Sequence, residues 1–188
     1  MLNIYNYYIE SESLPLFNDV YHLMDLFKDF SWLNKKYKKE MTDDERDQVK
    51  AIVMKSAELA FKFVQDIMDN KPWPEAEPTI AKNGSYAGLY AINILHRRFK
   101  QAEPNIMINP TAAGSYAQYI LAKDPEWTKT PGHENGRWPE AEPYIIKNDY
   151  ATLYYAINVL KKRWKEYEDI ADRDSRIWEM YLNFFEVE

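Results

Sequence analysis

The chain has 188 residues, a length that suits one domain or a short repeat array with a cap. It contains no cysteine, which excludes disulfides and thiolate metal sites, and only 5 glycines, which disfavours an all-β fold with many tight turns. The formal net charge of −6 provides no general attraction for phosphate backbones, so nucleic acid is not an expected partner.

The N-terminal segment, residues 1–72, is predicted to form a helical cap on the rest of the chain. Residues 1–12 are polar and rich in tyrosine, without the features of a secretory signal, and suit a tail or a strand. Residues 14–39 suggest an amphipathic helix. A capping-box pattern at 42–45 starts a second helical stretch, whose periodicity runs to Asn70. Because no run reaches the roughly 18 apolar residues that span a bilayer, we expect no membrane contact and a cytoplasmic location.

From residue 73 onward the chain is an internal repeat with a period of 26 residues. WPEAEPTIAKN at 73–83 and WPEAEPYIIKN at 138–148 agree at nine of eleven positions, and related copies begin at Phe99 and Trp164. A fixed period of this size is typical of stacked helical arrays. LAFKFVQDIM, in the preceding segment, resembles the copies with a shift of 27 residues. We therefore predict an all-α protein, a short array of two-helix repeats with an N-terminal helical cap. The array occupies 73–188, with copies at 73–98, 99–137, 138–163 and 164–188.

Aligned columns within the copies predict where each helix lies. An asparagine followed by Gly, Pro or Asp is a preferred N-cap and marks the start of the longer helix. The segment before it has prolines four residues apart, so we expect a tight turn and then a short helix. A tyrosine followed by an alanine forms a buried stripe along the longer helix. The structural columns are the aromatic residues between copies (Trp73, Phe99, Trp138, Trp164), the caps (Asn83, Asn109, Asn148) and the tyrosines (Tyr90, Tyr116, Tyr155).

The second copy carries about 13 additional residues, which we place in an inserted loop at 122–136. Its Pro, Gly and polar residues predict a protruding loop rather than another helix, and such insertions often emerge on the binding face. Aromatic and arginine residues supply most binding hot spots, so we predict that Trp127, His133 and Arg137 contact a partner. An alternative is that Trp127 and Arg137 stack on a nucleobase, which would make the chain a nucleotide- or RNA-binding protein.

Two columns of glutamates recur in the short segments. The first column includes Glu75 and Glu140, and the second includes Glu77 and Glu142. Carboxylates in a first helical turn are favoured by the helix dipole, and an arginine directly before the aromatic column could pair with them. A functional interpretation is an acidic face, with glutamates at regular intervals along the array, that recognises a basic partner. On that interpretation these four glutamates are partner contacts.

No set of residues specifies catalysis. Asp19, His22 and Asp25 are spaced by three on a predicted helix, but positions six apart drift around the helix, which disfavours a shared metal. His133 with one neighbouring glutamate is too little for a general base or a zinc site. His96 ends a predicted helix, where the dipole favours a cation. We therefore predict that the chain is not an enzyme and binds no metal or cofactor.

The amino-acid pattern of the repeat resembles that of a known protein family. The run RWPEAEPYI at 137–145, followed by Asn148 and a helix rich in Tyr and Ala, is similar to the RWPEAEPxI repeat of proteins encoded by tailed bacteriophages. The resemblance covers residues 73–188, although the second copy departs from it at 100–101 and the fourth at Asp169. It implies a phage product made during infection and acting in the host cytoplasm, and it implies no particular activity.

Together these inferences favour a non-enzymatic protein-interaction module that binds a host or phage protein, such as a defence factor. Two alternatives stay open: a protein that binds or sequesters nucleotides or RNA, and a structural component of the phage particle. The C-terminal segment also offers a surface through which two copies of the chain could pair. Its aromatic residues are Trp178, Tyr181, Phe184 and Phe185.

Overall fold

The computed structural model describes residues 30–186, and all regular structure in this range is helical, so the prediction of an all-α protein is confirmed. The predictions for residues 1–12, for most of 14–39 and for the group containing His22 lie outside the described residues. Within the described range, no helix is long and apolar enough to cross a membrane. The chain divides into two compact units between Thr79 and Ile80, a few residues after the boundary predicted at 72/73.

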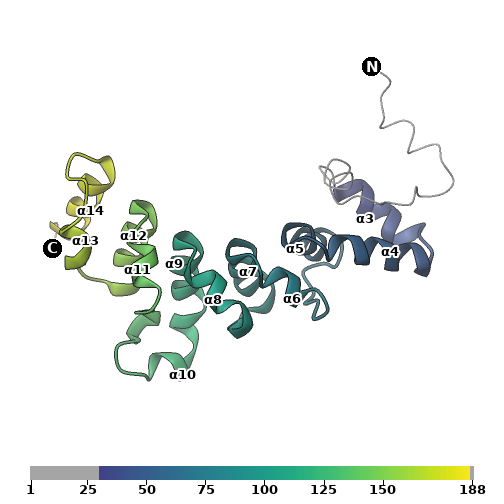
Figure 1. Ribbon diagram of the computed structural model, residues 1–188, viewed down its shortest axis with the longest axis horizontal. Helices are drawn as coiled ribbons and strands as arrows, with labels where there is room; N and C mark the ends of the chain where they lie inside the picture. Colours follow the sequence, from purple (N-terminus) through teal and green to yellow (C-terminus); the bar gives the residue numbers. More distant parts are fainter. Residues whose placement is uncertain (1–29, 187–188) are drawn as a thin grey trace, which may run out of the picture. The chain divides into compact units, whose positions relative to one another are not determined.

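The described part of the first unit begins with α3 (Phe30–Lys39), α4 (Asp43–Val53) and α5 (Ala57–Asp66) (Figure 1). The predicted capping box is present at the start of α4. The side chain of Thr42 accepts a hydrogen bond from the backbone N–H of Glu45, whose carboxylate accepts one from the backbone N–H of Thr42 at 2.7 Å. This reciprocal pair satisfies two of the free donors at the helix start.

The stretch of helical periodicity from the capping box to Asn70 contains two helices, because the chain breaks after α4. Ser56 adopts an extended conformation, with φ −132° and ψ 130°, and its side chain caps the start of α5 by accepting from the N–H of Leu59. Serine competes well for backbone donors at such a position, so it starts a new helix where apolar periodicity alone shows no interruption. The helices on either side bury Val49, Val53 and Phe63.

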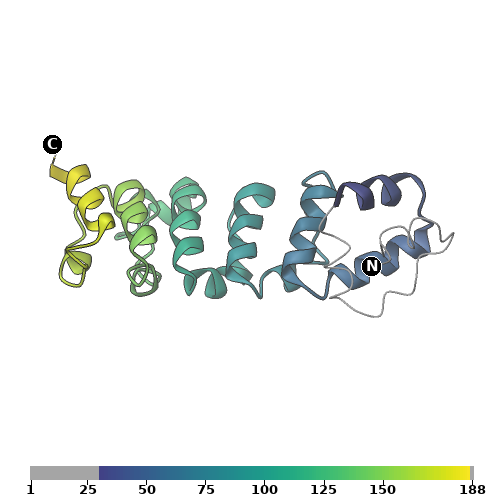
Figure 2. The ribbon, with the colours of Figure 1, turned by 90° about the horizontal axis from the view of Figure 1, so that it is seen from above.

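From α6 onward, short and long helices alternate. Each copy contributes a short helix and then a longer one, and Figure 2 shows the longer helices of the second unit side by side. The short helices are α6 (Glu77–Ile80), α8 (Glu103–Met107, preceded by η2, Lys100–Ala102), α11 (Glu142–Ile145) and α13 (Lys165–Glu168). The longer helices are α7 (Gly84–Tyr90, extended by η1, Ala91–Leu95), α9 (Pro110–Tyr119), α12 (Asp149–Tyr155, extended by η5, Ala156–Leu160) and α14 (Arg176–Glu186).

The long helices start where the asparagine column predicts. Asn83, Asn109 and Asn148 are the N-caps of α7, α9 and α12, and each side-chain oxygen accepts backbone N–H groups of the first turn. The first and third copies then end in a π-helical turn whose C-cap, His96 or Lys161, has a positive φ. A left-handed residue at this position terminates a helix and turns the chain into the next short segment.

The aromatic column packs each copy against the tyrosine of the copy before it. The rings of Tyr90 and Phe99 lie 5.6 Å apart, and the other pairs in the second unit have the same tilted geometry, at 5.6 Å for Tyr116 and Trp138 and 5.5 Å for Tyr155 and Trp164. All six rings are buried. Inside the first unit, Phe63 and Trp73 repeat this geometry at 5.3 Å. Phe63, in the segment LAFKFVQDIM, therefore occupies the position that the tyrosine column has in the later copies.

The inserted segment is more ordered than the predicted loop, because it contains η3 (Leu121–Lys123), α10 (Pro125–Thr128) and η4 (Glu134–Gly136). The expectation that it contains no helix is wrong for α10, a single turn capped by the side chain of Asp124. Gly136 holds a φ of +84°, and a Cβ there would lie 2.4 Å from the carbonyl oxygen of Ala117. Only glycine permits this close return of the segment to α9.

Candidate functional site

The residues predicted to bind a partner from the inserted segment are engaged within the chain. The guanidinium of Arg98 lies 4.5 Å from the centre of the Trp127 ring, and the ring of His133 stacks on Trp127 at 4.2 Å. Both groups therefore contact the indole from within the chain. The Trp127 indole N–H donates to the backbone oxygen of Arg137 at 3.0 Å. Because Trp127 is already engaged by Arg98, His133 and Arg137, this geometry gives no support to the nucleotide-binding alternative.

Arg137 belongs to a network of hydrogen bonds that recurs in the second, third and fourth copies. Its guanidinium donates two hydrogen bonds to the carboxylate of Glu142, at 2.7 and 2.9 Å. The same carboxylate accepts from the hydroxyl of Tyr155 at 3.3 Å, and that hydroxyl accepts from the backbone N–H of Trp138 at 2.7 Å. The network ties the start of the copy to its own long helix.

The other two networks have the same connections. In the second copy Arg98 holds Glu103 with two hydrogen bonds of 2.7 Å, and Tyr116 links Glu103 to the backbone at Phe99. The fourth copy uses the equivalent residues Arg163, Glu168, Tyr181 and Trp164. A charged group that is partly buried is stabilised only when it is paired in this way. The second glutamate column is therefore structural in these copies.

The environment of the networks also shifts the pKa values of the tyrosine hydroxyls and of the Glu168 carboxylate. Burial raises the pKa of Tyr116 and Tyr155 far above the ordinary value and raises the pKa of Tyr181 to about 12. These hydroxyls therefore keep the proton that they donate to the glutamates. Hydrogen bonding from Arg163 lowers the pKa of Glu168 below its ordinary value, so this carboxylate is ionised at neutral pH.

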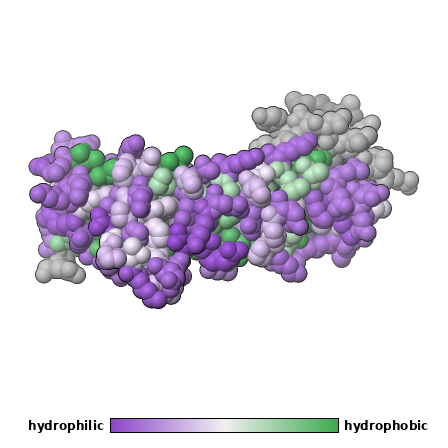
Figure 3. All heavy atoms as spheres, turned by 60° about the horizontal axis from the view of Figure 1, so that its bottom comes forward, coloured by the Kyte–Doolittle hydropathy of each residue, from purple (hydrophilic) through white to green (hydrophobic). Residues whose placement is uncertain are grey.

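The first glutamate column lies on the surface. Glu75, Glu140 and Glu166 are exposed, and Glu166 borders a hollow of about 210 Å³ beside Trp164. Glu142, at the edge of the same hollow, is already held by Arg137. Figure 3 shows a view in which the bottom of Figure 1 comes forward, and hydrophilic residues cover most of the visible surface. This distribution is that of an ordinary solvated surface.

A different surface, which sequence reasoning did not single out, carries no charge. It lies on the outer sides of α7, α9 and α12 and their π-helical extensions, and we call it the long-helix face. None of its residues is buried. Four columns in each of three copies make it up: Ser85, Leu89, Ile92, Asn93; Thr111, Ser115, Gln118, Tyr119; Tyr150, Tyr154, Ile157, Asn158.

Not one of these twelve residues is charged, although charged residues make up 29% of the chain. Random sampling at that fraction would place three or four charges among twelve positions. The ammonium of Lys123 lies 6.0 Å from the centre of the Tyr119 ring. In the fourth copy the column of Ser85 holds Arg176, whereas the other three columns hold Met180, Asn183 and Phe184, which are uncharged.

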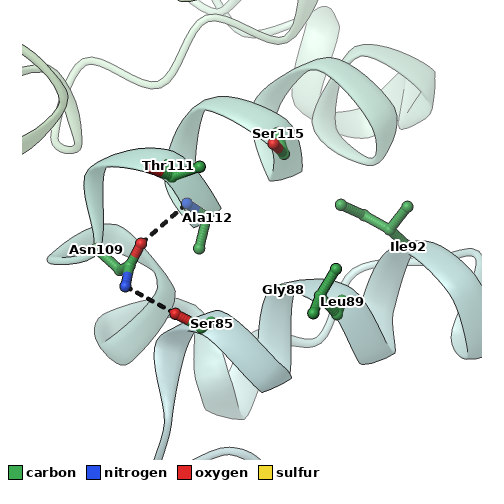
Figure 4. A pocket seen from close by; sticks show the side chains of 8 residues that line it. All are labelled: Ser85, Gly88, Leu89, Ile92, Asn109, Thr111, Ala112 and Ser115. Carbon is green, nitrogen blue, oxygen red and sulfur yellow. Dashed lines mark hydrogen bonds between the residues drawn. The ribbon is translucent and has the colours of Figure 1, made fainter. Parts of the chain in front are cut away.

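An open groove crosses the long-helix face between α7 and α9. It encloses about 170 Å³, and Figure 4 shows Leu89 and Ile92 pointing into the space between the two helices. A hydrogen bond of 2.9 Å from the amide of Asn109 to the hydroxyl of Ser85 joins the helices at one end. All the lining residues are uncharged: Ser85, Gly88, Leu89, Ile92, Asn109, Thr111, Ala112 and Ser115.

The equivalent junction between α9 and α12 is bridged by tyrosine. The hydroxyl of Tyr154 donates to that of Tyr119 at 3.2 Å, so the two side chains meet between the helices. The amide of Gln118 also donates to Asn158 at 3.4 Å. In the α7–α9 junction the column of Tyr154 holds Ser115, which is too short to reach α7 in this way. Small side chains therefore leave the first junction open.

The aromatic residues at the C-terminus are only partly available. Tyr181 is buried and belongs to the network of the fourth copy, whereas Phe184 is half exposed. Met180, one turn before Phe184, is also exposed. Pairing of two chains through α14 would therefore use Met180 and Phe184 rather than Tyr181.

Among residues 30–186, no group of three or more His, Asp or Glu side chains is placed to hold a metal ion. Comparisons with family models, with curated proteins and with solved structures find no match for the chain. Comparing aligned positions between copies, rather than neighbouring residues along the chain, would have revealed the uncharged columns of the long-helix face from the sequence. The uncharged long-helix face, with its open groove, is the candidate functional site.

Proposed function

We propose that the chain is a non-enzymatic protein-interaction module and that its long-helix face contacts the partner. The observation that carries this proposal is the complete absence of charge from twelve exposed or partly exposed positions in a highly charged chain. The centres of protein interfaces are depleted of Lys, Glu and Asp and enriched in Tyr, because desolvating an unpaired charge is costly.

The residue types on the face support a protein partner. Tyr, Ser and Asn are the residues that antibody paratopes use, since tyrosine gives a large contact area at low entropic cost and the short polar side chains adapt their hydrogen bonds. Tyr119 and Tyr150 are exposed at 42% and 69%. Leu89 and Ile92 add apolar area at the groove between α7 and α9. A neutral surface of this kind provides no counter-charge for nucleic-acid phosphates.

The resemblance to phage repeats supplies the proposed context. We propose that the partner is a host or phage protein met in the host cytoplasm, such as a defence factor that the chain inhibits or redirects. The repeated networks support a rigid array, and rigid elements present a binding surface more accurately than loops do. The same array would let surface columns vary from copy to copy without loss of the fold.

Affinity capture from phage-infected bacteria tests this proposal with two matched variants. Leu89→Arg with Tyr119→Arg places charges on the long-helix face, and Glu75→Lys with Glu140→Lys changes charges on the exposed glutamate column. We expect the wild-type chain to retain a specific protein, the face variant to lose it and the glutamate variant to keep it. Retention by the face variant together with loss by the glutamate variant would reverse the assignment. Failure of the wild-type chain to retain any protein would contradict the proposed function.

A further inference from the structure

We propose that the groove between α7 and α9 is an anchor pocket for one uncharged aromatic side chain, of phenylalanine size, presented by a peptide segment of the partner protein. This inference rests on the proposed function and adds the chemistry of the central contact. Binding energy in interfaces concentrates in a few aromatic anchors seated in such pockets.

The size of the groove matches one ring. It encloses about 170 Å³, and an apolar cavity of about 150 Å³ holds a single benzene molecule. Its floor is formed where Gly88 meets Ala112, since a Cβ added to Gly88 would lie 3.3 Å from the Cβ of Ala112. Leu89 and Ile92 supply an apolar wall on the α7 side. A whole helix or a nucleotide is larger than this space.

The chemistry of the groove excludes a charged anchor. No lining residue carries a charge, so a lysine or glutamate side chain would lose its hydration there without gaining a counter-ion. The hydroxyls of Thr111 and Ser115 line the α9 side of the groove. Hydroxyls at the edge of an apolar pocket can bond the backbone that carries the anchor, which favours a peptide over a free hydrocarbon.

The neighbouring junction shows which group fills a space of this kind. Between α9 and α12, Tyr150 and Tyr154 stand in the columns that hold Thr111 and Ser115 one copy earlier. The side chain of Tyr154 reaches across that junction to Tyr119. The chain thus supplies an aromatic ring at the second junction, and the same space at the first junction is open for a ring from the partner.

Heteronuclear NMR of the isotope-labelled full chain tests the anchor without knowledge of the partner. The probe is the blocked tripeptide acetyl-Gly-Phe-Gly-amide, and the matched probes carry Lys or Glu in place of Phe. We expect the Phe peptide alone to shift the backbone amide signals of Gly88, Ala112 and Ser115. Ser115→Tyr, which introduces the residue of the next copy, should weaken this binding about tenfold or more, equivalent to roughly 1.4 kcal/mol. Thr111→Tyr, which copies Tyr150, is a second closing variant if Ser115→Tyr alters the fold.

The reverse variant sharpens the test. Tyr154→Ser should open the α9–α12 junction, so that the Phe peptide also shifts the amide signals of Gly114 and Ala151. Equal shifts with the Lys or Glu peptide, or unchanged binding of the Phe peptide by both closing variants, would overturn the anchor pocket. Capture of a partner is measured separately from binding of the Phe peptide. If the charged face variant loses the partner but the Phe peptide shifts no amide signal of the groove, the anchor pocket is overturned and the proposed function is not.

Discussion

The two junctions between the long helices of the first three copies have similar buried packing and different surfaces. Beneath both, an aromatic residue of the later copy packs on the tyrosine of the earlier one at 5.6 Å. On the outside, the α7–α9 junction has serine and threonine and an open groove, whereas the α9–α12 junction is bridged by Tyr154 and Tyr119. The comparison indicates that the buried columns preserve the packing of the array, whereas the exposed columns differ from one junction to the next.

The junctions also differ in how closely the backbones approach. At the start of α7, a Cβ on Gly84 would lie 2.1 Å from the carbonyl oxygen of Asn105 in α8. The amide of Asn105 in turn donates to the backbone oxygen of Ala81 at 2.9 Å. In the α7–α9 junction itself, a Cβ on Gly88 would lie 3.3 Å from the Cβ of Ala112. Gly114, which holds the column of Gly88 one copy later, would have only an ordinary contact of 3.8 Å with Ala151. The open groove therefore lies above the tighter of the two junctions.

The largest effect on this comparison is expected from Gly84→Ala. The added methyl group would overlap a backbone oxygen, which cannot move as a side chain can, so α7 and α8 must separate. We expect the free energy of unfolding to fall by about 3 kcal/mol, from an overpacking cost that exceeds the gain in helix propensity. Urea unfolding followed by circular dichroism measures this change. An unfolding midpoint equal to that of the wild-type chain would show that the close approach at α7 is absent in solution.

The next largest effect is expected from removal of the buried tyrosine hydroxyl in one of the networks. Tyr155→Phe leaves the backbone N–H of Trp138 without its acceptor and takes one donor from Glu142. A buried donor without a partner costs about 1–3 kcal/mol, and we expect a loss of stability in this range. Tyr154→Phe is the matched control, because its hydroxyl bond lies on the surface. Equal losses for both variants would contradict the structural role of the network.

A smaller effect of opposite sign is expected from Gly114→Ala. The new methyl group fits beside Ala151, and alanine is favoured over glycine within a helix by roughly 1 kcal/mol, so α9 should gain about 0.5–1 kcal/mol of stability. Gly88→Ala tests the equivalent position of the tighter junction. Because its methyl group would press on Ala112, we expect it to gain less than Gly114→Ala. Thermal unfolding of the two variants measures the difference, and the opposite order would contradict the difference in spacing.

The last effect is confined to alkaline pH. The pKa of Tyr181 is raised from an ordinary value of 10.0 to about 12, so the folded state holds this proton more tightly than the unfolded state. The stabilisation is complete below pH 10 and is lost as the pH rises toward 12. The thermal unfolding midpoint of the wild-type chain should fall as the pH rises through this range, and that of the Tyr181→Phe variant should fall less steeply. A parallel decline of the two proteins would show that Tyr181 does not contribute.

Several features of the copies were predictable because they depend on local spacing. Asparagine followed by Gly, Pro or Asp marked the starts of α7, α9 and α12, and the tyrosine and alanine columns marked their buried sides. Spacing alone did not distinguish glutamates that pair with an arginine of the chain from glutamates that contact a partner protein. An arginine five residues before a glutamate reaches it only when the turn between them folds back, as it does from Arg137 to Glu142. The break at Ser56 was missed because the apolar periodicity continues through it.

Local residue patterns establish that the chain repeats, which side of each long helix is buried and where these helices begin, because caps and a spacing of three to four residues act within one turn or two. Packing between copies establishes that Tyr154 bridges its junction while Ser115 leaves a groove beside Leu89. That outcome depends on how closely helices from different copies approach. The approach is set by contacts such as Gly84 with Asn105, between residues that local patterns do not relate.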